Sequence, residues 1–527
     1  MLSAVFLVSN RAGFPILATA RGEARAALLA GGGAAGTSGA KPPWADPPLG
    51  DAGRGLTVAD LFSAAGGFTE GARQVGYTFV GALDYCRTAL ATHTLNHGGY
   101  HLLGDITDEV IQTTFVNEVR RILGEGERLS VLSGGPTCKA MSCASGATDP
   151  YDDRNQLFRS FVGVLAGLEP DVAIMENVGG LYTTLVPVPR GYPPLTLTQK
   201  NRVKVFFAKP KGKKGAEKRE WEDERFALLH DGLIAFVKDR IVADLDLVGY
   251  AMEFRIVNFA DFGVPQERKR AVGIAVRKTL GVPPAAFFPA NTHSKDGADG
   301  LPLWRTINDA LAGLPPAAPP RARGVGNPGP GPISVFHYAA DHDAETVAAI
   351  KAAQDAKAYG QRVQVKPGGR GNQARRLLNP DEPSKTVTCN NGQTFGHPTE
   401  PRLMTAHEMA RLQTFPDGYQ FQGPVGPKEG EHGQRMGVYE EVGNAVPPLF
   451  SRLLFARVAE VLKVARAGDP VPALQAPSSS AGAESSPSDR GAAGIDVAAP
   501  YVTPKDSPSL FWLFSQNPQV RGSCLVR

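Results

Sequence analysis

The strongest constraint on the fold is a regular alternation of short apolar runs with helix-like segments in the first half of the chain. The apolar runs have the length of buried strands and cover residues 56–62, 78–84, 129–133 and 171–176. The segments with helical periodicity cover residues 67–75, 87–96 and 156–168. Strands and helices in this order predict a doubly wound α/β fold with a parallel sheet. Because ligands of such sheets bind at the carboxyl ends of the strands, functional residues are expected directly after each run.

Cysteine usage and charge narrow the class of protein. The chain has 527 residues, enough for two or three folded units, and five cysteines without a C-x-x-C pair or zinc-like spacing. This scatter argues against a disulfide framework, and no metal site is expected. The net charge of +4 permits a polyanionic partner without demanding one. The apolar run at residues 4–8 is too short for a signal peptide or a membrane span, so a cytoplasmic protein is expected.

Both ends of the chain are expected to lie outside the ordered part. Residues 1–55 are rich in Ala and Gly, which predicts a disordered leader. An organelle transit peptide is the alternative for this leader, because it contains Arg and few acidic residues. Residues 466–490 are rich in Pro, Ser and Ala, so residues 466–527 are predicted to form a disordered tail.

A glycine-rich turn follows the first apolar run, which continues into D-L-F-S-A-A-G-G-F. Gly66 and Gly67 allow a tight turn, and the next helix offers its N-terminal amides to a ligand. Asp84 ends the second run, where it could accept ribose hydroxyls, and Asp105 in G-D-I-T could accept an adenine amine. Taken alone, a glycine pair is equally compatible with an ordinary turn. Position 64 is Ala, so the G-x-G-x-x-G pattern is incomplete. The glycine and acidic elements together favour an adenosine-containing ligand without a diphosphate, which fits S-adenosylmethionine better than NAD.

Three further polar segments follow predicted strands. The third run continues into G-G-P-T-C-K-A-M-S, which places Cys138 on a glycine-opened loop, although a lone cysteine is more often a small buried hydrophobe. Glu176 ends the fourth run and could exchange a proton with a ring nitrogen, or could simply cap a helix. F-G-V-P-Q-E-R-K-R presents Gln266, Arg268 and Arg270 at alternate positions, which share one face of a strand. Such donors suit recognition of an anion or a base edge, and a solvated charge run is the alternative.

In this order and wording, the segments resemble the cytosine-5 DNA methyltransferase family. The likeness continues in R-L-M-T-A-H-E-M-A-R-L-Q-T-F-P at residues 402–416 and in V-G-N-A-V-P-P at residues 442–448. It covers roughly residues 56–465, and the Q-x-R-x-R, A-R-L-Q-x-F-P and G-N-A-V-P-P elements are specific. The resemblance implies a Rossmann-like methyltransferase sheet with a second, smaller target-recognition domain. It also implies methyl transfer from S-adenosylmethionine to carbon 5 of cytosine in a specific duplex DNA sequence.

The resemblance also implies how the chain is divided. The catalytic, S-adenosylmethionine-binding domain would span residues 56–280, with a basic insertion near residues 185–225. The target-recognition domain would span residues 281–434, and residues 435–465 would return to the catalytic domain. Residues 200–219 contain nine Lys or Arg against one Glu, which predicts either a phosphate-contacting arm or a disordered basic loop.

Site residues follow from the same resemblance. The Cys138 thiolate would add to carbon 6 of a flipped-out cytosine, and Glu176 would hold and protonate ring nitrogen 3. Arg270 would contact the cytosine carbonyl oxygen, and Arg268 would support Glu176 and the cysteine loop. The implied cofactor contacts are Phe62, Gly66, Gly67, Asp84, Tyr85, Asp105, Ile106 and Asn444. The implied contacts to the substrate are Thr137, Lys139, Ser142, Asn177 and Gln266.

Three positions depart from the usual family pattern. Ala64 replaces Gly in the turn after the first strand, and Thr137 replaces the Pro that usually precedes the cysteine. Lys139 replaces Gln directly after the cysteine, where an ammonium would lower the thiol pKa and could contact a phosphate. These changes are interpreted as variation within an active enzyme.

The expected partners are duplex DNA and a cognate restriction endonuclease that recognises the same site. The enzyme is expected to be a monomer associated with the nucleoid and without membrane contact. DNA contacts are expected from Arg370, Arg375 and Arg376, for which a solvated loop is the alternative. Three other functions remain as alternatives: an RNA methyltransferase, a non-catalytic DNA-binding regulator and an NAD-linked oxidoreductase.

Overall fold

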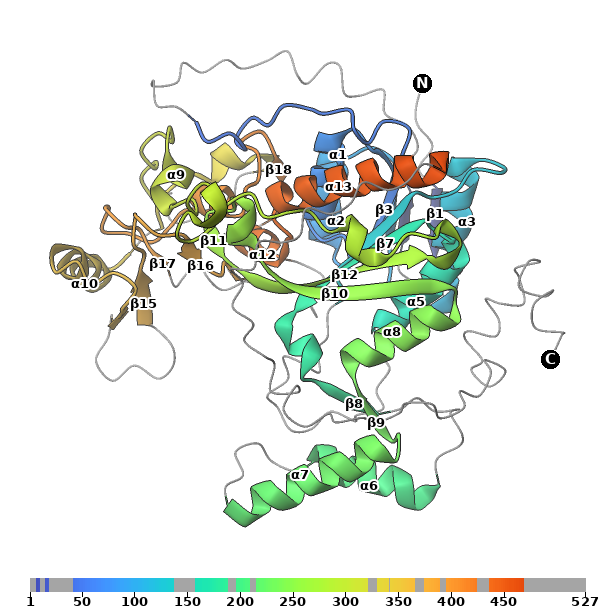
Figure 1. Ribbon diagram of the computed structural model, residues 1–527. Helices are drawn as coiled ribbons and strands as arrows, with labels where there is room; N and C mark the ends of the chain where they lie inside the picture. The colour runs from blue at the N-terminus through green and yellow to red at the C-terminus, as the bar shows by residue number, and fades with distance from the viewer. Residues whose placement is uncertain are drawn as a thin grey trace, which may run out of the picture.

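The computed structural model has a single mixed sheet at its centre, flanked by helices (Figure 1). It describes residues 6–9, 15–18, 41–136, 157–187, 196–208, 215–320, 329–340, 342–364, 374–388, 395–423 and 436–468. The seven sheet strands are β3 (Thr57–Leu61), β4 (Thr78–Asp84), β5 (Tyr100–Leu103), β6 (Val131–Gly134), β7 (Val172–Val178), β10 (Tyr250–Asn258) and β12 (Lys269–Arg277).

Strand order confirms the doubly wound α/β prediction. The order is β10-β12-β7-β6-β3-β4-β5, and β7, β6, β3, β4 and β5 are mutually parallel. β12 adds antiparallel to β7, and β10 adds antiparallel to β12, so one edge of the sheet is antiparallel. The chain leaves β3 in one direction and resumes with β6 on the other side, which creates a switch point between these two neighbours.

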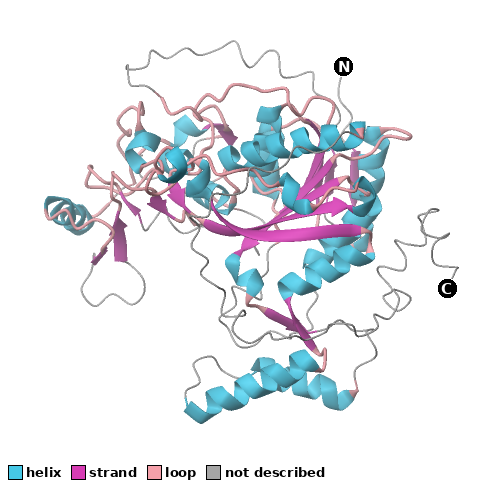
Figure 2. Cartoon of the chain, viewed as in Figure 1, coloured by secondary structure: helices cyan, strands magenta, loops and turns pink. Residues whose placement is uncertain are grey.

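Helices cover both faces of the sheet (Figure 2). One face packs against α3 (Glu109–Leu123), α5 (Leu157–Leu168) and α8 (Val237–Leu247), and the other against α1 (Gly67–Val75) and α13 (Pro448–Ala467). Alternate strand residues enter opposite layers: Ala59 packs with the first helices, and Val58 with the second. Each such buried Val or Leu contributes about 1.5–3 kcal/mol, so this two-sided burial explains why the strands are almost wholly apolar.

The N-terminal boundary differs from the prediction. Within the expected disordered leader, β1 (Phe6–Ser9) pairs with β2 (Pro15–Ala18), and residues 41–55 pack against the body. Trp44 is buried, and its indole N–H donates to the carbonyl of Arg411 over 3.2 Å. The boundary predicted at residue 55 is therefore too late, because one buried aromatic side chain in a Pro-rich stretch gives no periodic signal.

The second part of the chain does not form one separate body. Met404 and Phe415 pack in the same core as Ala65, which lies in the turn after β3. A smaller unit, here called the recognition unit, projects from the body at the left of Figure 1. It consists of α10 (Ala344–Asp355), β14 (Arg362–Gln364), β15 (Ala374–Leu377) and β17 (Phe395–Gly396). Its own small core includes Ile350 and Leu377.

Candidate active site

The predicted site residues gather at the carboxyl edge of the parallel strands, next to the switch point. The turn after β3 and the loop after β6 open at this edge because β3 and β6 are neighbours. The described chain follows the second of these only to Pro136. The predicted residues Thr137, Cys138, Lys139 and Ser142 lie outside the described residues.

The turn after β3 is held by Asp84 from the neighbouring strand. One carboxylate oxygen accepts the Ala64 N–H over 2.8 Å, and the other accepts the Cys86 N–H over 2.7 Å. Burial raises the pKa of Asp84, and the N–H donors of Cys86 and Ala64 oppose this effect. Phe62 and Ala64 have positive φ angles of 53° and 45°, a region that L-residues seldom occupy. The Gly that the family usually places at position 64 would adopt this angle without strain.

The two glycines of this turn are required by protein packing. A Cβ on Gly66 would lie 2.7 Å from the Tyr419 hydroxyl, and one on Gly67 would lie 2.0 Å from the carbonyl oxygen of Val446. Gly67 therefore lets the returning V-G-N-A-V-P-P segment sit directly on the turn. The sequence predicted a tight turn and cofactor contacts for these glycines, and the structure adds this packing requirement.

A network of buried polar side chains lies beneath the turn, and the sequence analysis did not predict it. Ser133 donates to Asp60 over 2.8 Å, and Thr69 donates to the other oxygen of Asp60 over 3.0 Å. His93 contacts the Thr69 hydroxyl over 3.0 Å and His101 over 2.8 Å. Burial raises the pKa of Asp60 to about 7 and lowers the pKa of His101 to about 4. This network therefore joins β3, α1 and β5 through groups that are largely neutral between about pH 4 and pH 7.

Tyr419, from the C-terminal part of the chain, makes a further contact with the turn after β3. The Tyr419 hydroxyl donates to the carbonyl of Ala65 and lies 3.0 Å from Nε2 of His97. Burial raises the pKa of Tyr419 well above its usual value, so the hydroxyl remains a donor. The only signal in the sequence was the position of Tyr419, shortly after the A-R-L-Q-T-F-P element.

Three of the other predicted cofactor residues, Tyr85, Asp105 and Ile106, lie just after β4 and β5. The exception is Asn444, which lies on a helix near the C-terminal end of the described chain. Asp105 is exposed, and one of its oxygens accepts both donors of Thr107. The Tyr85 ring is 45% exposed and could stack on a flat ligand, whereas Ile106 is buried in the core. Asn444 is exposed at the end of α12 (Val438–Asn444), where its amide lies 3.6 Å from the sulfur of Met436.

The fit to an adenosine-type ligand depends on two observations. Carboxylates from adjacent strands, Asp84 and Asp105, end at one edge of the sheet beside an exposed tyrosine ring. The Ser63 hydroxyl, inside the turn, is buried and has no hydrogen-bond partner among the described residues. Buried hydroxyls are normally paired, so this atom is suited to a polar group of a ligand.

A Glu–Arg pair lies on the other side of the switch point. Arg270 Nε is 2.9 Å from Glu176 Oε1, and both side chains are mostly buried, at 14% and 13% exposure. Within the described part of the chain, this oxygen nevertheless has no partner with hydrogen-bond geometry. The loop after β6 begins against the same carboxylate, because a Cβ on Gly135 would lie 3.6 Å from Glu176 Oε2. Glu176 is thus close to the start of the loop that contains Cys138.

The two arginines have different positions from those expected. Arg268 donates to the carbonyl of Val387 over 2.6 Å, and no ion pair joins it to Glu176. Burial lowers the pKa of Arg268 to about 9; the charge of Arg270 acts in the same direction and that of Glu176 opposes it. Arg268 is therefore still cationic at neutral pH, and Arg270 is the residue that pairs with Glu176.

Gln266 and Asn177 contact protein groups. Gln266 is fully buried; it donates to Gln413 over 2.7 Å and accepts the Val387 N–H over 2.7 Å. The expected contact of Gln266 with the substrate is thus not compatible with its position. Asn177 is also buried and donates to the carbonyl of Pro136 over 2.9 Å, so it anchors the start of the cysteine loop.

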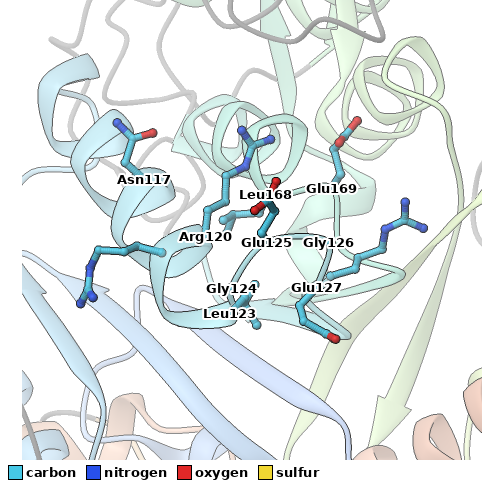
Figure 3. Close-up of a pocket in the computed structure, with 11 residues that line it drawn as sticks. Asn117, Arg120, Leu123, Gly124, Glu125, Gly126, Glu127, Leu168 and Glu169 are labelled. Atoms are coloured by element: carbon cyan, nitrogen blue, oxygen red, sulfur yellow. The ribbon is translucent and has the colours of Figure 1, made fainter.

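Two adjoining surface hollows lie away from these residues, at the amino edge of the sheet. The larger, about 540 Å³, is lined mainly by the C-terminal end of α3 and the segment that follows it, including Arg120, Glu125 and Glu127 (Figure 3). The smaller, about 430 Å³, includes Ser130 and Asp171, which lie at or just before the starts of β6 and β7. Ligands of doubly wound sheets bind at the opposite edge, so we assign no function to these hollows.

Among the described residues, no helix is both long and apolar enough to cross a membrane. Within the same ranges, no group of three or more His, Cys, Asp or Glu side chains has an arrangement that could hold a metal ion.

Comparison with known proteins defines the class of enzyme. The sequence model of the C-5 cytosine-specific DNA methylases matches residues 56–185 and 234–460. This match covers more than half of the chain. Its two parts include the turn after β3, the Glu–Arg pair and the returning V-G-N-A-V-P-P segment. The chain therefore belongs to the C-5 cytosine-specific DNA methylase family and is a DNA (cytosine-5-)-methyltransferase.

Individual relatives are bacterial enzymes of similar length. The Type II methyltransferase M.DdeI of Desulfomicrobium norvegicum is 27% identical over 423 residues, which cover 77% of this chain and 88% of that protein. The Type II methyltransferase M1.HphI of Haemophilus parahaemolyticus is 27% identical over 425 residues, with 77% and 87% covered. Among solved structures, a DNA modification methyltransferase encoded within an E. coli prophage has a TM-score of 0.47 at 20% identity, covering 77% of this chain and 99% of that one.

Proposed function

We propose that this enzyme transfers a methyl group from S-adenosylmethionine to carbon 5 of a flipped-out cytosine in a specific duplex DNA sequence, through a covalent adduct with Cys138. The observation that supports this most strongly is the Glu176–Arg270 pair against the first residues of the cysteine loop. A carboxylate, an arginine and a nucleophile within reach of one another are what addition to a pyrimidine ring requires.

S-adenosylmethionine would bind on the cofactor side of the switch point. Asp84 would accept ribose hydroxyls, Asp105 the adenine amine, and the exposed Tyr85 ring would stack on the base. Ser63 offers a further hydroxyl in the turn. When bound, the cofactor supplies an electrophilic methyl group on a sulfonium sulfur.

Base activation would come from the chain's own residues. The Cys138 sulfur forms a bond to carbon 6, and the electrons of the C5–C6 double bond make carbon 5 nucleophilic. Glu176 keeps a proton on ring nitrogen 3, so that negative charge does not accumulate on the base. After methylation, a general base removes the carbon 5 proton, the C5–C6 double bond re-forms, and the bond between carbon 6 and Cys138 breaks.

The two arginines would have different roles. Arg270 would keep Glu176 oriented, while its Nη1 donates to the carbonyl of Lys269 over 2.8 Å. The other N–H groups of Arg270 would bind the carbonyl oxygen of the base. Arg268 fixes Val387, at the base of the recognition unit, to the catalytic sheet. None of this can occur in a stacked duplex, so the base must be flipped at a cost of a few kcal/mol.

DNA reading would belong to the recognition unit. Arg376 lies on β15 and pairs in register with Arg362 of β14. The side chain of Arg375 and the whole of Arg370 lie outside the described residues. Cations on this unit would contact phosphates or guanine edges.

We also propose that the enzyme is cytoplasmic and monomeric and acts on the nucleoid. Its likeness to Type II methyltransferases supports the further proposal that it pairs with a restriction endonuclease of the same specificity.

The test uses the full chain and its Cys138→Ala variant in a host without cytosine methylation. Host DNA is sequenced after bisulfite conversion, and purified enzyme is assayed for methyl transfer to duplex DNA and to transfer RNA. Protected cytosines in one short context, absent with the variant, are the expected result. Methylation of transfer RNA alone, or of DNA at full rate by the variant, would contradict the proposal.

A further inference from the structure

A helical insertion interrupts the family domain. The family match omits residues 186–233, and in the structure these residues begin and end in a two-stranded stalk, β8 (Leu185–Pro187) and β9 (Ile234–Phe236). Beyond the stalk lie two helices, α6 (Leu197–Ala208) and α7 (Gly215–His230), which project from the sheet at the bottom of Figure 1.

The helical insertion has its own core. Phe206 stacks on Trp221, with ring centroids 5.1 Å apart and planes at 12°, and both pack with Leu228. Arg202 of α6 bridges Glu224 and Asp231 over 3.1 and 3.0 Å, which fixes the two helices to each other. Its described part is therefore a folded element, and the alternative of a disordered basic loop is wrong for these residues.

The stalk is anchored beside the active site. Glu176 lies near the end of β7, a short 3-10 helix (Gly179–Tyr182) follows, and β8 begins only nine residues after Glu176. The Tyr182 hydroxyl donates to the carbonyl of Phe254 over 2.9 Å, and the Val237 N–H donates to the carbonyl of Thr184 over 2.9 Å. The base of the stalk is thus tied to the sheet next to the Glu–Arg pair.

The charged residues of α6 are all basic. This helix contains Lys200, Arg202 and Lys204 and no acidic residue. Lys200 and Lys204, one helical turn apart, are exposed, and neither pairs with a carboxylate of the described residues. On α7, three Lys or Arg residues stand against five Asp or Glu residues, so the positive surface of the described insertion lies on α6.

We propose that the helical insertion binds the phosphate backbone of duplex DNA that flanks the target cytosine. The proposal rests on the proposed function, because the target base must already lie at the Glu–Arg pair. A helix of 12 residues spans about 18 Å at 1.5 Å per residue, or about 5 base pairs at 3.4 Å per pair. α6 is therefore long enough to follow the phosphate backbone for about half of one turn.

Duplex DNA is favoured over a protein partner by these cations. Each lysine that neutralises a phosphate releases counterions, which makes the contact favourable and salt-dependent. Leu197, Val205 and Phe226 are also exposed on the helical insertion, and a protein partner would have to cover them. The experiment below separates the two partners.

Binding is measured by fluorescence anisotropy between 50 and 200 mM salt, with the Lys200→Gln/Lys204→Gln variant. The matched control is Lys278→Gln/Lys463→Gln, which removes two exposed lysines from other parts of the molecule. Each duplex contains the target sequence found by bisulfite sequencing, and extends either about 3 or about 15 base pairs beyond it on each side. Methyl transfer by the unmodified enzyme is measured on both duplexes, so that failure of the proposed function is recognised separately.

On the long duplex, we expect the insertion variant to reduce the slope of log K against log salt by about 1.8, or about 0.9 per lysine. The slope should not change for the control, nor for either variant on the short duplex. A second variant replaces residues 188–233 by Asn-Gly, a two-residue turn that can join the stalk strands. Unchanged slopes for both insertion variants, while the unmodified enzyme methylates DNA, would overturn the proposal. A change in oligomeric mass with no change in slope would also overturn it, in favour of a protein partner.

Discussion

The two halves of the active-site edge differ in what holds their polar groups. On the half proposed to bind the cofactor (the cofactor half), Asp84, Asp60 and Tyr419 each bond to neighbouring protein groups, and these bonds fix the turn after β3. On the half proposed to bind the base (the base half), Glu176 forms an ion pair with Arg270, but among the described residues neither Glu176 Oε1 nor Arg268 Nε has a partner with hydrogen-bond geometry. A buried polar atom without a hydrogen bond costs about 1–3 kcal/mol, and a bound substrate can relieve this cost. We therefore expect the first half to be held in place before its ligand binds, and the base to complete the second half.

The largest effect is expected from Glu176→Gln. The amide cannot hold a proton for ring nitrogen 3, so methyl transfer should fall about 10²–10⁴-fold, the usual contribution of general acid–base catalysis. S-adenosylmethionine affinity should change less than twofold, because Glu176 lies on the base half. The same substitution at Glu169, beside the hollow at the amino edge (Figure 3), should leave the rate unaltered. Equal losses of rate and of cofactor affinity in Glu176→Gln would remove the distinction between the halves.

Gly67→Ala should disturb the cofactor half most. Its Cβ would lie 2.0 Å from the Val446 carbonyl oxygen, so the returning segment must shift. We expect a loss of about 3 kcal/mol in the free energy of unfolding, measured by denaturant titration, with weaker cofactor binding. Gly98→Ala is the control, because a Cβ there meets no atom within 4 Å. If Gly67→Ala were as mild as Gly98→Ala, the turn would not depend on this packing.

Asp60→Asn should reveal the neutral network beneath the turn. The pKa of Asp60 is about 7 in the folded protein against 3.8 for a free side chain. A raised carboxyl pKa means that the folded state binds the extra proton, so stability from this group is lost as pH rises from about 4 to 7. The amide of the variant is neutral throughout, so its stability relative to the unmodified protein should rise by about 1.4 kcal/mol per pH unit in that window. Denaturant titrations at pH 5, 6 and 7 measure it, and a constant difference would contradict the assignment.

Ala64→Gly should have the smallest effect, and a favourable one. Ala64 has φ of 45°, which costs about 1–2 kcal/mol for an L-residue, while Gly costs about 0.5–1 kcal/mol in unfolded-chain entropy. A net gain of about 0.5–1 kcal/mol in the free energy of unfolding is expected, with the methyl-transfer rate unchanged. Ala65→Gly, at a fully buried position without positive φ, should instead destabilise. A loss of stability in Ala64→Gly would mean that the turn is unstrained.

Local signals explain which parts of the fold were predictable. The predicted bounds of α1, β4 and α2 (Arg87–Asn96) agree with the structure, because glycine turns and apolar runs mark these ends directly. Contacts between distant segments gave no such signal: Gly67 meets Val446, and His97 meets Tyr419. The helices of the helical insertion were missed as well, because basic residues obscure their periodicity.

The arginine assignments show a similar limit. The alternate-position argument assumed one strand through Gln266, Arg268 and Arg270, but Gln266 lies on β11 (Gln266–Glu267), which pairs with β16 (Ser384–Lys385). Arg268 falls between β11 and β12, so the three side chains reach different neighbours. The residue types were predictable from the motif, whereas their partners depended on a strand from the second part of the chain.

Trapping the covalent adduct tests the central claim most directly. A duplex with 5-fluorocytosine at the target position cannot lose a carbon 5 proton, so the adduct should persist after methylation. The enzyme is incubated with this duplex and S-adenosylmethionine, denatured, digested and analysed by mass spectrometry. We predict one peptide linked through Cys138 to the methylated base, and none with Cys138→Ala. A link through another residue, or no adduct from enzyme that methylates the ordinary duplex, would contradict the mechanism.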